Sequence, residues 1–199
     1  MHQSITRRED PAWAQGNNLA LIVDFHNEVK RSFQHEVSRM DEKLEVGSLP
    51  DHEKTALCAK RDSYLNTFGP YLRVNTFLMM ISYLEEWLLH TWRDRTPTTG
   101  LLEAKGSIGR FKPVLKSFGV DLSRSGPWMF LKGCQDVRSC LLHANGRVSL
   151  NRKPSRVRNF AAQNGDLVRI ESDRLVLQER FLTRLQEALN ALIDSVKPA

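Results

Sequence analysis

Residues 71–92 read YLRVNTFLMMISYLEEWLLHTW, the most apolar stretch of the chain and the one that decides its fold. Apolar residues recur there every three or four positions, the spacing that places side chains on one face of an α-helix. They are Val74, Phe77, Leu78, Ile81, Leu84, Leu88 and Trp92. So wide an apolar face predicts a central helix, and periodicity fits both the interior of a bundle and a dimer interface.

The segments upstream of this stretch carry the same helical spacing. One long helix is predicted from just after Asn17-Asn18 to Gly47, with an apolar stripe of Ile22, Phe25, Val29, Phe33, Val37, Met40 and Leu44. A second helix is predicted over 51–68, with Asp51 as its N-cap. Gly69-Pro70 is predicted to break or kink the chain, because proline disrupts the preceding helical turn.

The downstream half adds shorter elements. Asn145-Gly146 is a helix stop signal, and LVRIES and RLVLQ alternate apolar and polar residues on either side of Ser172-Asp173, as in a hairpin. The order predicted is a connector over 94–105, a short helix over 108–118, a helix over 128–144, a basic irregular stretch after Gly146, the hairpin, and a final helix over 179–196.

Composition places the chain among ordinary globular proteins. It has 199 residues, 41% hydrophobic and 26% charged, which excludes collagen-like, low-complexity and wholly disordered classes. The three cysteines form no CxxC, so neither a disulfide framework nor a zinc site is expected. No apolar run reaches membrane-spanning length, and polar residues follow Met1 where a signal peptide would be apolar. We therefore expect a cytoplasmic protein.

These observations predict a mainly α fold, a helical bundle with a small β-hairpin near the C-terminus. Residues 1–16 are polar and lack periodicity, so they are expected to form a flexible arm before a single domain over 17–199. Lys and Arg number 29 against 23 Asp and Glu, and the formal charge of +6 suits a polyanionic partner.

One local constellation carries chemistry. Residues 136–146 read DVRSCLLHANG and place Arg138 and His143 near the end of a helix. Ser139 and His143 lie four positions apart on one helix face, so the hydroxyl is expected to bond and orient the imidazole. Histidine transfers protons near neutral pH and arginine binds phosphate in a bidentate manner. Together they suit metal-free RNA cleavage, in which a 2′-hydroxyl attacks the adjacent phosphate.

A purely structural role is the alternative for this constellation. His143 would then cap a helix carbonyl, and Arg138 would form a surface ion pair with Asp136. Common signatures of other enzymes, such as GxGxxG, HExxH and GxSxG, do not occur in the sequence. We expect no metal and no cofactor.

An arginine, a polar residue, mostly apolar residues and a histidine before Asn-Gly resemble the signature of the HEPN superfamily. The preceding apolar helix with embedded acidic residues is similar to the helix beside that signature in the family. The hairpin and terminal helix resemble one prokaryotic branch of it. The resemblance covers about residues 17–196.

The resemblance implies a homodimer whose paired helices form one composite Arg/His cleft. It implies a metal-independent endoribonuclease, a toxin of a toxin–antitoxin or phage-defence system with an antitoxin or defence-complex partner. Arg138 would stabilise the scissile phosphate, His143 would transfer the proton, and Ser139 stands where the family most often has asparagine. Either Glu85 or Glu86 would reach the cleft from the neighbouring helix.

A basic segment follows directly. Residues 147–158 contain five basic and no acidic side chains: Arg147, Arg152, Lys153, Arg156 and Arg158. They would bind the RNA backbone, or they form a solvated loop with no ligand. Apart from Phe160, no aromatic ring offers a stacking platform there. The alternatives to the enzyme are a non-catalytic HEPN-like module that binds RNA or a protein partner, and a structural helical adaptor.

Overall fold

The computed structural model describes residues 11–46, 49–95, 108–120, 122 and 125–196, with the backbone alone at 11–17, 94 and 95. The fold is mainly helical with a two-stranded antiparallel hairpin near the C-terminus, as the sequence predicts. Helix α1 spans Pro11–Glu45. Residues 11–16, predicted as part of the arm, are therefore helical, because proline fits the first turn of a helix. The rest of the predicted arm, residues 1–10, lies outside the described residues.

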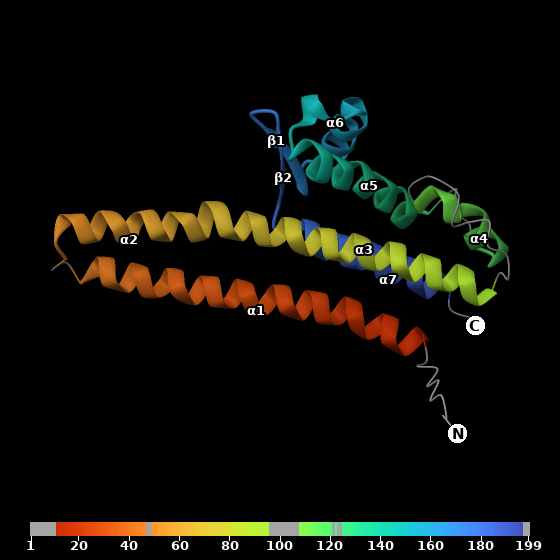
Figure 1. Cartoon of the computed structure of the whole chain (residues 1–199), viewed down its shortest axis with the longest axis horizontal. Coiled ribbons are helices and arrows are strands. Elements are labelled where there is room, and N and C mark those ends of the chain that lie inside the picture. Colours follow the sequence, from red (N-terminus) through yellow and green to blue (C-terminus); the bar gives the residue numbers. More distant parts are fainter. Residues whose placement is uncertain (1–10, 47–48, 96–107, 121, 123–124, 197–199) are drawn as a thin grey trace, which may run out of the picture.

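Helices α2 (Asp51–Ser63), η1 (Tyr64–Phe68, a π-helix) and α3 (Gly69–Arg95) form one rod that runs antiparallel to α1 (Figure 1). The predicted N-cap was wrong, because Pro50 is the cap and Asp51 is already helical. Gly69 also has helical angles, so the rod does not break at Gly69-Pro70. The wider π turn just before Pro70 accommodates a residue that lacks an N–H and crowds the preceding turn.

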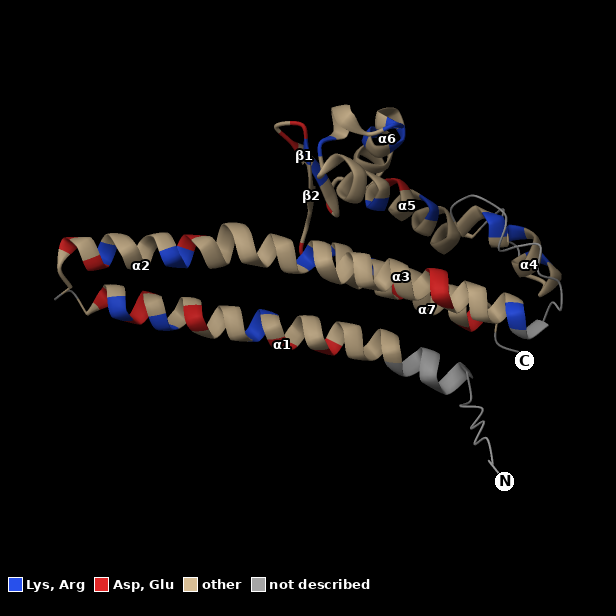
Figure 2. Ribbon diagram, in the orientation of Figure 1, with Lys and Arg blue, Asp and Glu red and all other residues tan. Residues whose placement is uncertain are grey.

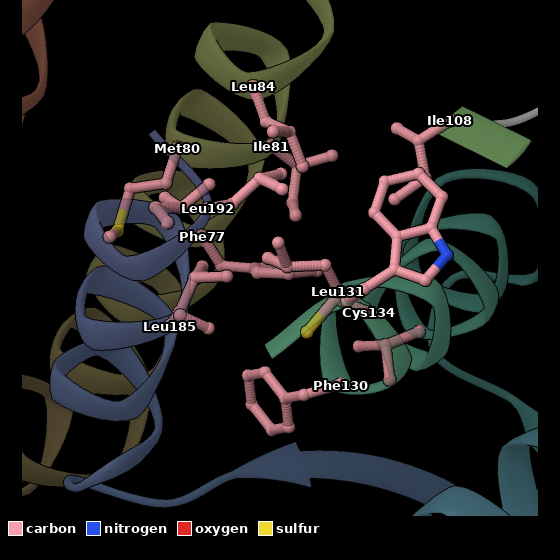
Figure 3. Packing of buried hydrophobic residues seen from close by; sticks show 14 of the residues in the cluster. Phe77, Met80, Ile81, Leu84, Ile108, Phe130, Leu131, Cys134, Leu185 and Leu192 are labelled. Carbon is pink, nitrogen blue, oxygen red and sulfur yellow. The ribbon is translucent and has the colours of Figure 1, made fainter. Parts of the chain in front are cut away.

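The core forms where α3 meets α5 (Gly126–Ala144) and α7 (Phe181–Val196). Figure 3 shows their side chains pointing toward one another across this space. Phe77, Ile81 and Leu84 of α3 are fully buried, as are Leu131 of α5 and Leu185 of α7. The apolar face of residues 71–92 is thus filled largely by the chain itself, which makes α3 the central helix.

Helix α1 differs from its predicted apolar stripe at one turn. Phe25, assigned to the buried face, is 52% exposed, while the adjacent His26 is only 9% exposed. Met40 is buried farther along, but α2 has no buried residue. Among the described residues, the end of α1 and the helix α2 pack only on each other, with no third layer, so much of their apolar surface stays open. Their joined ends extend beyond the other elements (Figure 1).

The short helix predicted over 108–118 consists of the 3₁₀-helix η3 (Ile108–Phe111) and α4 (Lys112–Ser117). Pro113 occupies the first turn of α4, where it disrupts no hydrogen bond. The first two residues of the predicted connector over 94–105 belong to α3, which ends at Arg95. The remainder of that connector lies outside the described residues. The stretch after Gly146, predicted to be irregular, instead contains η4 (Val148–Leu150) and α6 (Pro154–Gln163). Strands β1 (Val168–Glu171) and β2 (Arg174–Leu177) form the predicted hairpin.

Ser172 and Asp173 both have positive φ at the tip of this hairpin, the backbone that a tight two-residue turn requires. The three cysteines, Cys58, Cys134 and Cys140, are free. No described helix combines the length and the apolar character needed to cross a membrane.

The buried His26 makes the stability of the fold depend on pH. Its burial, the Lys30 charge and the Arg73 charge lower the pKa of His26 below 6.5, although Glu179 opposes them. Just below pH 6.5, His26 is therefore protonated in the unfolded chain but still neutral in the folded chain. The free energy of unfolding consequently falls as pH drops below 6.5. His26→Asn, which retains a donor toward Thr76, should unfold in urea with a smaller stability loss between pH 7.5 and 5.5. An equal loss in the variant would contradict this prediction.

Candidate functional site

Arg138 of α5 reaches across to α3. Its Nη2 lies 3.5 Å from Oε2 of Glu85, and the two side chains are 30% and 31% exposed. The adjacent Glu86 is 70% exposed and lies 3.8 Å from Nε2 of His90. The structure therefore brings Glu85, and not Glu86, to Arg138, a choice that the sequence left open. Among the described residues, no ion pair joins Arg138 to Asp136, the partner considered in the structural alternative.

The guanidinium of Arg138 keeps donors available beyond this ion pair. Its five N–H groups form a planar fork, and the contact with Glu85 uses one nitrogen. The buried Nε has no hydrogen-bond partner within the described part of the chain. Because Glu85 restrains one edge of the fork and the head is partly exposed, the terminal N–H groups that the ion pair leaves free are chemically able to bind an anion such as phosphate.

His143 lies in the last turn of α5 with its side chain exposed. The expected hydrogen bond from Ser139 does not form, and within the described residues no protein group holds the imidazole. Exposed polar atoms are satisfied by water, which removes the need for an internal partner. Five helical steps separate the residue from Arg138, about 7.5 Å along the axis and about 140° around it, so both side chains leave the C-terminal half of α5 but in different directions.

The predicted stop after His143 is confirmed. Asn145 and Gly146 both have positive φ, at 47° and 74°, and the Gly146 N–H donates to the Cys140 carbonyl at 3.1 Å. The chain then pairs with β2, because Gly146 O accepts from Leu175 N at 2.9 Å. The end of α5 is thereby tied to the hairpin.

Basic residues lie near Asp173, at the tip of the hairpin that pairs with the end of α5. Hydrogen bonds from the Ser149 hydroxyl and N–H lower the pKa of Asp173, and the nearby charges of Arg158 and Arg147 lower it further. Two members of the predicted RNA-binding set therefore lie close to the hairpin tip. Arg174 of β2 adds a third guanidinium there, donating to the Asn145 carbonyl at 3.1 Å.

All five basic residues of the 147–158 segment are exposed. The last part of the predicted irregular stretch is instead α6, which carries Arg156 and Arg158 in its first half; Figure 2 shows basic residues on this helix. The spacing of Val157, Phe160 and Ala161 after Pro154 was the signal for this helix, since these three are its buried face. Phe160 is only 7% exposed, so its ring is not available to stack on a base.

A second group of polar residues escaped the sequence analysis. His26 and Lys30 of α1, Arg73 of α3 and Glu179 before α7 converge on one pocket. The signal was a histidine inside an apolar helical stripe with a lysine four residues later, a pattern that is common and of low specificity.

No protein-family model, no curated protein and no solved structure matches the chain.

Proposed function

We propose that the protein is a metal-independent endoribonuclease of HEPN type that acts as a homodimer. The observation that carries the proposal is the ion pair between Arg138 and Glu85, which restrains the guanidinium of Arg138 on the helix that also carries the exposed His143 five positions later. A second copy with its α5 facing the first would double this set in one cleft.

The proposed reaction uses these side chains without a metal. The 2′-hydroxyl of RNA loses its proton to one His143 and attacks the adjacent phosphorus. The bond to the 5′-oxygen breaks, and the second His143 of the dimer donates a proton to that leaving oxygen. Arg138 stabilises the negative charge that develops on the phosphate, with Glu85 holding its guanidinium in position. The products are a 2′,3′-cyclic phosphate and a 5′-hydroxyl.

The exposed basic residues after α5 supply the affinity in this proposal. Arg147 and Arg158 lie near Asp173, and Arg156 shares α6 with Arg158. Backbone contacts from such side chains release counterions, so binding should weaken as salt rises.

The direct test incubates a structured RNA with the purified protein in EDTA. We expect cleavage products with cyclic phosphate ends and a dimer by sedimentation. RNA that is bound but stays intact would overturn the enzyme and favour the non-catalytic RNA-binding module. If the protein neither cleaves nor binds RNA, the structural helical adaptor would be the remaining hypothesis.

A cellular test addresses the proposed role as a toxin or defence nuclease. Expression of the protein should slow the growth of its bacterial host, and expression of His143→Ala should not. Equal growth inhibition by both would argue against cleavage as the cause.

Glu85 offers a test that depends on the observed ion pair. Glu85→Gln keeps the shape of the side chain but loses the charge that holds Arg138, so the cleavage rate should fall by about tenfold. Glu86→Gln is the matched control, because the adjacent carboxylate contacts His90 and should leave the rate unchanged. Equal rates for the two variants, measured by gel assay, would contradict the assignment.

A further inference from the structure

A pocket of about 470 Å³ opens between α1, η1 and α3 at the level where β2 leads into α7. Its volume lies within the range of small-molecule sites. One part of the wall is apolar and comes from Phe33, Val37, Tyr64, Leu65 and Leu72. The polar lining residues are His26, Lys30, Arg73 and Glu179, together with Gln34 and Ser38 of α1.

Two cations converge on one carboxylate at the polar end. Lys30 Nζ lies 2.7 Å from Oε2 of Glu179, and Arg73 Nη1 contacts Oε1 of the same residue. Arg73 is held further by a 3.1 Å hydrogen bond from Nε to the Leu177 carbonyl. Burial opposes ionisation of Glu179, but the Lys30 hydrogen bond and the Arg73 charge lower its pKa overall. Two positive charges against one negative leave a net positive charge at this end.

His26 adds a hydrogen-bonding group with a defined orientation. Thr76 Oγ1 donates its hydrogen to the Leu72 carbonyl at 2.9 Å, so it accepts from His26 Nδ1, also at 2.9 Å. The lone pair of the neutral ring is therefore on Nε2. Within the described residues no protein group bonds Nε2, and the ring lines both this pocket and a smaller one of about 170 Å³.

We propose that this pocket binds a small amphiphilic monoanion, with its apolar body against Phe33 and Leu72 and its anionic group between Lys30 and Arg73. A cation of the same shape would meet two positive charges and one negative, which disfavours it. The anion would share the donors that Glu179 now uses, because lysine has three N–H groups and arginine five. This site is independent of the proposed RNA cleft.

The first experiment uses the full chain and the fluorescent aromatic sulfonate anilinonaphthalenesulfonate as the probe. We expect saturable binding of one probe molecule per chain. Octanoate should displace the probe, and octylamine, which has the same tail and the opposite charge, should displace it far less. Equal displacement by the two would overturn the proposal, as would binding without saturation.

Variants then separate the pocket from general surface binding. Lys30→Met should weaken probe affinity by about tenfold, the value of one charge-assisted hydrogen bond. Lys43→Met is the matched control, since Lys43 is an exposed lysine on the same helix outside the pocket. It should bind the probe as the parent does.

Glu179→Gln tests the proposal in the opposite direction. Removing the carboxylate that competes for Lys30 and Arg73 should tighten probe binding severalfold. A loosened fold would expose apolar surface and raise probe binding without saturation in either variant, so a saturable one-site gain in Glu179→Gln together with a loss in Lys30→Met is specific to the proposed site. Weaker binding to Glu179→Gln, or an unchanged affinity in Lys30→Met, would overturn it.

Discussion

His143→Ala is expected to slow RNA cleavage by a factor of about 10² to 10⁴, the contribution of a general acid or base to a proton-transfer step. The exposed side chain lies in the last turn of α5, and no described protein group depends on its ring. The variant should therefore fold and dimerise as the parent does. The measurement is the initial rate on a structured RNA in EDTA, with unfolding and dimer mass determined on the same samples.

His35→Ala is the control for this prediction, because His35 is an exposed histidine on α1, far along the chain from α5. It should cleave at the parental rate. If His143→Ala also cleaves at that rate, the proposed proton transfer at His143 is wrong, and the activity belongs to another site or to a contaminant.

Gly133→Ala is expected to destabilise the fold by about 2 kcal/mol, even though alanine normally favours a helix over glycine by about 1 kcal/mol. A β-carbon at this position of α5 would overlap the ring of Phe160 on α6. That ring is only 7% exposed and packs on Phe130 at a centroid distance of 5.5 Å, which restricts its movement. The melting temperature should fall by about 4–8 °C, measured by thermal unfolding.

Two comparisons isolate the contact with Phe160. Gly165→Ala, where the added carbon would meet only the Ala161 carbonyl at 3.8 Å, should leave stability nearly unchanged or slightly raised. In a Phe160→Leu background, the cost of Gly133→Ala should shrink, because the smaller side chain can yield. A cost that persists in that background would show that the glycine is needed for another reason.

The helices and the hairpin could be predicted because they follow from local rules. The periodicity of 71–92 identifies α3, Asn145-Gly146 ends α5, and the residues around Ser172-Asp173 form the turn. The predictions that were wrong also concern local structure. Pro70 continues a rod instead of breaking it, and the helix that begins at Pro154 was missed because basic residues obscured its apolar spacing.

The candidate site could be predicted only in part. Arg138, Ser139 and His143 are neighbours on one helix, so the sequence alone identified them as a set. The partner of Arg138 could not be chosen, because Glu85 lies on another helix and the rotation of α3 against α5 decides which carboxylate faces it. The expected bond between Ser139 and His143 failed because spacing permits a contact without requiring it.

The sequence by itself determined where the helices run and stop, which face of α3 is apolar, and that an arginine and a histidine lie near the end of α5. Only the tertiary structure decided that Glu85 and not Glu86 pairs with Arg138, that His26 is buried and Phe25 exposed, and that Gly133 admits the Phe160 ring. The physical reason is the range of the interactions involved. Propensity, periodicity and turn geometry act over a few residues. Burial and pairing depend instead on packing between helices that are distant in sequence, as in the hydrogen bond between His26 of α1 and Thr76 of α3, which lie 50 residues apart.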